Sequence, residues 1–381
     1  MNYIRPSWET EEHSMFRESA RKFIEKEFVP NRERWIEQGY MEPEYWQKAG
    51  ETGLLCPDIP IDFGGGGGDF GFDAITYEEA MRGCITSFGN AIQSIVGHYL
   101  LKYGTEDQKV RWLPKMATGE IITAIAMTEP GTGSDLQGVK TRAVRDGDDY
   151  LLSGSKIFIT NGYNADLVCV VCKTDPEEGA KGTSLLMVET KDLEGFSKNT
   201  PLKKIGCRGQ DTCELFFDTC RVPAGNLLGG QEGQGFYQLM AQLPRERLMI
   251  AVGAIAGIEA ALEEAVNYTK GRKAFGKTIA DFQNTKFKLA EMATEARIGR
   301  VFVDDCIEKL NAGTLDTETA SMAKWWCTEK QFETANQALQ LHGGYGYMME
   351  YPIAHYFADS RVQMIYGGTN EIMKEVISRS L

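Results

Sequence analysis

The strongest constraint on the fold is a double change in the periodicity of apolar residues along the chain. From about residue 10 to residue 116 these residues recur at helical spacing, as Phe16, Ala20 and Phe23 do. From about residue 121 to residue 228 short apolar or alternating runs are separated by turn residues, a pattern typical of strands. Helical periodicity returns from about residue 235 to the end. The sequence therefore predicts helices, a β insert and helices again.

A chain of 381 residues exceeds what one hydrophobic core usually supports, so several packed units are expected. The changes in periodicity divide it into residues 1–120, 121–230 and 231–381. The density of turns in the middle unit favours a compact antiparallel sheet or barrel. The predicted class is therefore α+β and multidomain, with helical domains on either side of a central antiparallel β domain of barrel or sandwich type.

Charge and hydropathy restrict the partners. The formal net charge of −13 argues against nucleic acid, because a sequence-independent grip on phosphates needs a basic surface. The longest near-continuous apolar stretch, residues 248–258, is too short to cross a bilayer, so no membrane insertion is expected. The N-terminal residues have no apolar signal core. We predict a cytoplasmic, bacterial protein.

Nine scattered cysteines in a chain of this length indicate reduced thiols rather than a disulfide framework. Cys169 and Cys172 have the spacing of a zinc or redox motif, but they lie in an apolar run rich in valine. On a strand, residues three apart point to opposite faces, so these two sulfurs could not share one metal. We predict a core strand and no metal site.

Five consecutive glycines, residues 64–68, interrupt the first helical stretch. No Lys-Ser or Lys-Thr pair follows them, and no strand-helix pattern lies nearby, which argues against a phosphate-binding loop. A flexible surface loop is expected here.

Two candidate sites lie in the β insert. Residues 128–135, Thr-Glu-Pro-Gly-Thr-Gly-Ser-Asp, combine hydroxyl donors with glycines that allow a ligand to approach the backbone. A polar turn after a strand explains them equally well. In residues 156–162, Phe158 and Thr160 would share one face of a strand. Phe158 could then stack on a flat ring while Thr160 forms a hydrogen bond with it. Ordinary strand packing is the alternative.

Two more candidates are glycine-flanked segments of the C-terminal stretch. Residues 271–277 gather Arg272, Lys273 and Lys277, and could hold a pyrophosphate or simply form a solvated helix end. Residues 340–346 form a glycine-rich corner after a helix, in which a structural role for His342 is favoured over a catalytic one.

Glu246, between two arginines, directly precedes the apolar run that begins at Leu248. If that run is a buried helix, Glu246 is a carboxylate at the edge of the core, where its pKa can be tuned for base chemistry. A glutamate paired with its flanking arginines is the alternative. Near the end of the chain, residues 366–371 form a glycine turn followed by residues able to cap the last helix.

Taken in order, these motifs resemble one family, the acyl-CoA dehydrogenases. The resemblance covers essentially the whole chain and is strongest at residues 127–135, 156–162, 272–276, 340–346 and 365–371. It implies an all-α N-terminal domain, a central β domain and a C-terminal four-helix bundle. It also implies FAD as cofactor and a homotetramer built as a dimer of dimers.

The resemblance also assigns roles by position. Residues expected to bind FAD are Ile125, Met127, Thr128, Gly133, Ser134, Phe158, Thr160, Arg272, Phe275, Gln283, Gln340, Gly343, Gly344, Thr369 and Glu371. In this set Phe158 and Thr160 would contact the isoalloxazine ring of FAD. Arg272 would reach across a subunit interface and bind the pyrophosphate of FAD. Residues expected to bind the substrate are Ser134, Arg247 and Gly367. Arg247 would meet the CoA moiety, and Gly367 would offer its backbone N–H.

One departure from the family pattern concerns the base. Many members have a catalytic glutamate in a Tyr-Glu-Gly-Thr motif, but this chain has Tyr366-Gly367-Gly368-Thr369. The isovaleryl and long-chain branches instead place the base in an earlier Glu-Arg-Leu motif, which matches Glu246-Arg247-Leu248 here. The resemblance is closest to that long-chain and isovaleryl-type branch, and it makes Glu246 the expected base.

The implied reaction is the FAD-dependent α,β-dehydrogenation of an acyl-CoA to the trans-2-enoyl-CoA, as in β-oxidation of fatty acids. Glu246 would take the α-proton while flavin N5 takes the β-hydride, and an electron-transfer flavoprotein would receive the electrons. The alternatives are a flavin-dependent acyl-CoA oxidase or monooxygenase on the same fold, and a non-catalytic protein that binds acyl thioesters. The sequence does not fix the acyl length or branching, and a carrier-protein thioester is a further alternative to CoA.

Overall fold

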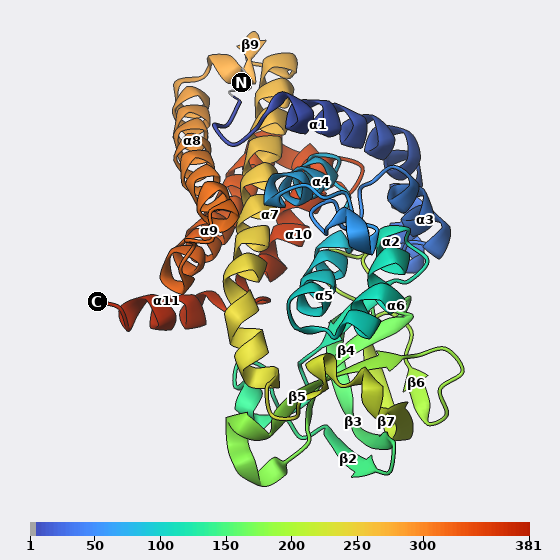
Figure 1. Ribbon diagram of the computed structural model, residues 1–381. Coiled ribbons are helices and arrows are strands. Elements are labelled where there is room, and N and C mark those ends of the chain that lie inside the picture. Colours follow the sequence, from blue (N-terminus) through green and yellow to red (C-terminus); the bar gives the residue numbers. More distant parts are fainter. Residues whose placement is uncertain (1–4) are drawn as a thin grey trace.

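The computed structural model describes residues 5–381 and has three parts in the predicted order: helices, a sheet and helices again (Figure 1). The helices of the first part are α1 (Glu11–Phe23), α2 (Arg32–Gln38), α3 (Pro43–Glu51), α4 (Phe70–Arg82), α5 (Asn90–Tyr103) and α6 (Glu106–Ala117). Helix α1 begins where the sequence indicates. Thr10 caps it, and Glu11 and Glu12 occupy its first turn, where the helix dipole favours acidic side chains.

The second part is a seven-stranded sheet. Its strands are β1 (Thr123–Ala126), β2 (Arg142–Asp146), β3 (Asp149–Thr160), β4 (Leu167–Lys173), β5 (Thr183–Glu189), β6 (Phe196–Lys198) and β7 (Thr212–Pro223). The spatial order is β1-β4-β2-β3-β7-β6, with β5 also paired to β4. Most pairs are antiparallel, as predicted, but β1 and β2 pair with β4 in parallel. The sheet is therefore mixed around its central strand.

Strand β4 confirms the interpretation of the cysteine pair. All seven of its residues are buried, and its side chains alternate between two hydrophobic clusters. Cys169 belongs to the cluster shared with the helices, and Cys172 to the cluster inside the β domain. Among residues 5–381, no group of histidine, cysteine and acidic side chains is placed to hold a metal ion.

The third part is helical. Its elements are α7 (Gly235–Gly271), a short hairpin of β8 (Lys273–Ala274) and β9 (Lys277–Thr278), α8 (Gln283–Asn311), α9 (Thr317–His342), α10 (Pro352–Ser360) and α11 (Asn370–Ser378). Helix α7 packs against α8 and α9 and also against α4 and α5, so it joins both helical parts. In Figure 1 it runs from the sheet at one end to the β8–β9 hairpin at the other. No helix in the described part of the chain is long and apolar enough to cross a membrane.

The five glycines at 64–68 form the surface loop that the sequence predicted, but hydrogen bonds hold its backbone along its whole length. All five backbone amides donate to carbonyl oxygens within residues 56–61, at N···O distances of 2.8–3.3 Å. A Cβ on Gly65 would lie 2.2 Å from the Ile59 carbonyl oxygen, and one on Gly66 would lie 2.6 Å from that of Pro57. The run is glycine because two backbone segments pack here without room for side chains.

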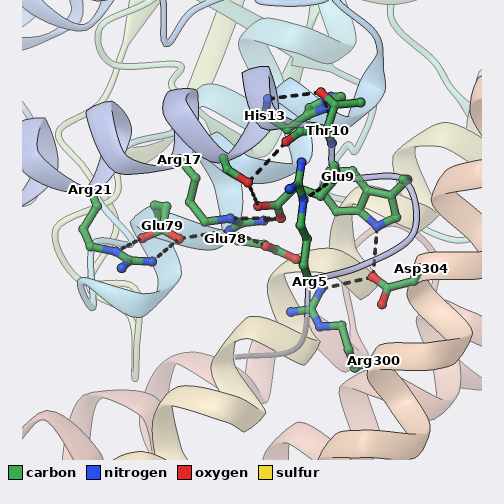
Figure 2. A network of polar contacts seen from close by, with 12 residues as sticks. Arg5, Glu9, Thr10, His13, Arg17, Arg21, Glu78, Glu79, Arg300 and Asp304 are labelled. Atoms are coloured by element: carbon green, nitrogen blue, oxygen red, sulfur yellow. Dashed lines mark hydrogen bonds and ion pairs between the residues drawn. The ribbon is translucent and has the colours of Figure 1, made fainter. Parts of the chain in front are cut away.

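A buried ion network ties α1 to α4 and α8 (Figure 2). The Arg17 guanidinium lies 2.7 Å from one oxygen of Glu78, and Arg300 pairs with the other oxygen and with Glu259. Burial alone would raise the pKa of Glu78, but Arg300 and Arg17 outweigh it and lower that pKa to about 2. The N-terminal helix is thereby fixed to the C-terminal bundle through paired interior charges.

Candidate active site

Glu246 is an interior carboxylate in the first half of α7. It is 7% exposed, and the phenolic oxygen of Tyr99 on α5 donates to its Oε1 atom at 2.8 Å. Burial raises the pKa of Glu246 to about 7, while the Tyr99 hydrogen bond and the charge of Arg247 act in the opposite direction. A carboxylate with a pKa near neutrality is suited to accept and release protons at neutral pH.

The two arginines beside Glu246 do not pair with it. Arg245 donates to Asp58 at 2.6 Å and to Asp73 at 3.0 Å, and Arg247 donates to Ser321 on α9 at 3.0 Å. Among the described residues Glu246 forms no ion pair, because neighbouring positions on a helix point in different directions. The alternative of a glutamate held by its flanking arginines is therefore wrong.

The carboxylates around Arg245 form a buried cluster with His98, whose Nε2 atom lies 3.1 Å from Asp58. Burial raises the pKa of Asp73 to about 7, and the nearby Asp58 adds to this effect. Burial would also raise the pKa of Asp58, but Arg245 and His98 outweigh it and hold that pKa well below its usual range. The cluster anchors α7 to α4 and α5 at the residue next to Glu246.

The turn at Gly367 and Gly368 faces the same side of α7 as Glu246. Gly367 has φ +66°, and a Cβ placed on it would lie 2.2 Å from Cδ1 of Ile250. Ile250 follows Glu246 by four residues, so the two side chains lie on one face of the helix. At position 367 the backbone conformation disfavours a side chain, and Ile250 fills the space that one would need.

A buried lysine holds this turn. The Lys324 ammonium on α9 donates to the Gly368 carbonyl oxygen at 2.8 Å and to Asn370 Oδ1 at 2.9 Å. Burial, with a contribution from the charge of Arg247, lowers the pKa of Lys324 to about 7. Thr369 then caps α11, as the sequence predicted, by accepting from the Ile372 amide. Glu371 is exposed in the first turn of that helix.

The candidate residues of the β domain lie close together at the edge of β1 and β3. Lys156 donates to the Met127 carbonyl oxygen, and the Ile157 amide donates to that of Thr128. Ile125 is half-buried on β1. Gly133 and Ser134 are exposed in the loop that follows, and a Cβ on Gly133 would meet nothing within 4 Å. This loop can therefore admit a ligand close to its backbone.

Phe158 is presented differently from the expectation of a regular strand. The pairing of β3 with β7 shifts between Lys156 and Ile159, and Phe158 has φ +61° within this irregularity. The residue is 63% exposed, whereas Thr160 is half-buried. Bulges of this kind redirect side chains beside functional sites. An aromatic ring held in solvent by strained backbone is available to stack on a flat ligand.

The remaining candidates cluster at the opposite end of α7. Arg272, Gln340, Gly343 and Gly344 line an open pocket of about 550 Å³, in which the Arg272 guanidinium lies 5.7 Å from the centre of the Tyr345 ring. Phe275, at the tip of the β8–β9 hairpin, is 95% exposed, and Gln283 is exposed at the start of α8. His342 is buried, stacks on Tyr268 and contacts the Ala338 carbonyl oxygen, which supports its structural role.

The two groups of candidate cofactor residues are far apart within one chain. The sheet contacts the beginning of α7, and the hairpin follows its end (Figure 1). A helix of 37 residues is about 55 Å long. One chain therefore cannot bring Phe158 and Arg272 to the same small molecule.

Comparison with known proteins decides the family. Three family models match in order: "Acyl-CoA dehydrogenase, N-terminal domain" at residues 10–120, "middle domain" at 124–220 and "C-terminal domain" at 233–381. The chain belongs to the acyl-CoA dehydrogenase family. It is 50% identical to the long-chain specific acyl-CoA dehydrogenase of Rattus norvegicus, over 97% of this chain and 86% of the relative. A crystal structure of an acyl-CoA dehydrogenase from Geobacillus kaustophilus is 48% identical and superposes with a TM-score of 0.96 over 99% of both chains.

Two residues of the candidate site had no signal in the sequence. Tyr99 lies in an apolar helix and meets Glu246 from 147 positions away along the chain. Lys324 lies among alanine and tryptophan on α9, and only the fold brings it to the Gly368 carbonyl oxygen. Pairs of this kind depend on helix packing, which a single sequence does not reveal.

Proposed function

We propose that the protein converts an acyl-CoA thioester to the trans-2-enoyl-CoA, with Glu246 as the base that removes the α-proton. The observation that supports this assignment most strongly is the environment of the Glu246 carboxylate. Glu246 is a buried carboxylate with no ion pair among the described residues, a pKa of about 7, and a place on the same face of α7 as Ile250, which packs against the Gly367 turn. A carboxylate buried without an ion pair costs stability, which is typical of groups retained for chemistry.

Residues of the chain itself accept the α-proton of the substrate and stabilise the charge that its removal leaves. The α-carbon loses its proton to Glu246, and the electron pair of that C–H bond forms the α,β double bond as hydrogen leaves the β-carbon with two electrons. Negative charge develops on the thioester oxygen, and the backbone N–H of Gly367 is the donor we assign to it. Lys324 keeps that turn in place through the Gly368 carbonyl oxygen.

The residues of both clusters suit FAD, which when bound would supply the acceptor for the two electrons and hydrogen. The Gly133 loop is open, the Phe158 ring is exposed and preset, and Arg272 lines an open pocket with glycines beside it. Because the clusters lie at opposite ends of α7, a helix about 55 Å long, we propose that each cofactor site combines the β domain of one subunit with Arg272, Phe275, Gln283 and the 340–344 corner of another. Such a site needs at least two subunits, and we propose the homotetramer, a dimer of dimers, that the family resemblance implies.

Arg247 is placed differently from what contact with the CoA moiety would require. Its guanidinium is buried against Ser321 and beside the charge of Lys324, rather than at a surface that a phosphate could reach. This position supports a role near the Gly367 turn and the acyl end of the substrate more than one at the CoA phosphates.

The relatives support the choice of substrate and electron acceptor. Half of the aligned residues are identical to those of long-chain specific acyl-CoA dehydrogenases, so we propose a long-chain acyl-CoA as the first substrate to test. A chain from a structure described as "Electron transferring flavoprotein of Acidaminococcus fermentans" superposes with a TM-score of 0.94 at 34% identity. We propose an electron-transfer flavoprotein as the acceptor.

The test is anaerobic titration of the flavin-loaded protein with acyl-CoAs of increasing length, beside the Glu246→Gln variant. We expect the flavin absorbance to bleach in the wild type, most completely with long chains, and to persist in the variant. Rapid peroxide formation in air without an added acceptor would favour the oxidase alternative. A flavin-loaded protein that no thioester bleaches would favour the binding-protein alternative.

A further inference from the structure

Polar contacts link two consecutive residues of α5 to two consecutive residues of α7. Tyr99 donates to Glu246, and the preceding residues His98 and Arg245 both contact Asp58. The Tyr99 side chain is completely buried. The ion-paired link fixes the separation of the two helices, so the hydroxyl and the carboxylate meet in a defined geometry.

The two oxygens of Glu246 are not equivalent. Oε1 accepts the Tyr99 hydrogen bond, whereas Oε2 has no hydrogen-bond partner among residues 5–381. One oxygen is thus held and the other is open. We propose that Tyr99 is a positioning residue for the base: its hydroxyl holds Oε1 and leaves Oε2 directed at the substrate. This inference rests on the proposed function of Glu246.

The hydroxyl remains a donor while Glu246 titrates. Burial, and the negative charge of Glu246 beside it, raise the pKa of Tyr99 well above its ordinary value. Two other titratable groups interact electrostatically with the carboxylate: Arg247 from α7, and the Cys169 thiol from β4, whose pKa burial raises well above its ordinary value. Of the three, only Tyr99 forms a direct hydrogen bond with Glu246.

A hydrogen bond to the ionised form lowers the pKa of a carboxyl group, so removing it should make Glu246 harder to ionise. For one bond to a charged acceptor, the expected displacement is about one pH unit or slightly more. Tyr99→Phe keeps the ring and its packing, and it removes only the hydroxyl.

The chain supplies a matched control one helical turn away. Tyr103 lies on α5 with its ring centre 6.2 Å from that of Tyr99, and its buried hydroxyl has no partner among the described residues. Tyr103→Phe therefore removes the same atom from the same helix without touching Glu246. The experiment compares flavin-loaded wild type, Tyr99→Phe, Tyr103→Phe and Glu246→Gln.

Two readouts are needed. The first is the pH dependence of the anaerobic flavin-reduction rate with a long-chain acyl-CoA. The second is an infrared titration of the protonated carboxyl C=O band, assigned by its loss in Glu246→Gln, which follows ionisation without catalysis. We expect both midpoints to move to higher pH in Tyr99→Phe by about one pH unit. Tyr103→Phe should match the wild type.

Superimposed profiles for wild type and Tyr99→Phe would overturn the assignment of Tyr99. Equal displacements in the two tyrosine variants would overturn it as well, since the effect would then belong to the helix rather than the hydrogen bond. Flavin reduction at the wild-type rate in Glu246→Gln would instead refute the proposed function itself, so the two failures are distinguishable.

Discussion

Replacing Glu246 by glutamine should remove the proposed base and also make the protein more stable at alkaline pH. The folded protein holds the pKa of Glu246 at about 7, against an ordinary value of 4.5. Below about pH 4.5 the carboxyl is protonated in both the folded and the unfolded state, so it costs nothing. As the pH rises, the unfolded chain ionises first, and folding stability falls until the folded-state pKa is passed.

Because the fold raises the pKa of Glu246, ionisation of this group lowers the free energy of unfolding by about 3 kcal/mol. This loss is fully present above about pH 7. Glutamine does not ionise, so the variant escapes this cost. Between about pH 5.5 and about pH 8, the free energy of unfolding of the variant should gain about 2 kcal/mol relative to the wild type. Any penalty of the glutamine amide itself is the same at both pH values and cancels.

The assay is urea unfolding of both proteins at equal concentration, without substrate, at the two pH values. A stability difference that is the same at both would refute the reasoning, because it would mean that Glu246 is not held protonated by the fold. A variant that loses stability relative to the wild type as the pH rises would contradict it more strongly.

Two further predictions concern the framework around the site. Gly66→Ala should lower the free energy of unfolding by about 1–3 kcal/mol, since its Cβ would lie 2.6 Å from a backbone carbonyl oxygen. Gly225→Ala, where nothing lies within 4 Å, should change it little, and equal urea midpoints for the two variants would contradict the packing argument. Arg300→Met should cost about 3–5 kcal/mol at neutral pH, because it leaves the buried Glu78 with one fewer cation. The exposed Arg379→Met serves as its control, and similar thermal unfolding of both variants would show that the buried network contributes nothing.

Local patterns predicted those features that depend on neighbouring residues. The three-part order, the burial of β4 with its cysteines on opposite faces, and the Thr369 cap all follow from side-chain periodicity or from one residue and the next turn. In each case the deciding contacts lie within a few residues or within one strand.

Predictions failed where distant backbone decides the outcome. The 64–68 glycines suggested a flexible loop because nothing in their own sequence shows the carbonyl oxygens of residues 56–61 that hold them. The alternation rule predicts a regular strand at Phe158, but the pairing of β3 with β7 shifts there and gives this residue a positive φ of 61°. The arginines flanking Glu246 suggested ion pairs, yet Arg245 finds Asp58 and Asp73 through the packing of α7 on the N-terminal helices.

The most direct test of the central claim isolates proton abstraction from electron transfer. A long-chain acyl-CoA analogue that cannot lose hydrogen at its β-carbon is incubated with the flavin-loaded protein in deuterium oxide, and deuterium at the α-carbon is followed by NMR. If Glu246 is the base, the wild type exchanges the α-protons, and Glu246→Gln, with its flavin still bound, does not. Exchange at the wild-type rate in Glu246→Gln would contradict the account, because some other group would then be removing the proton.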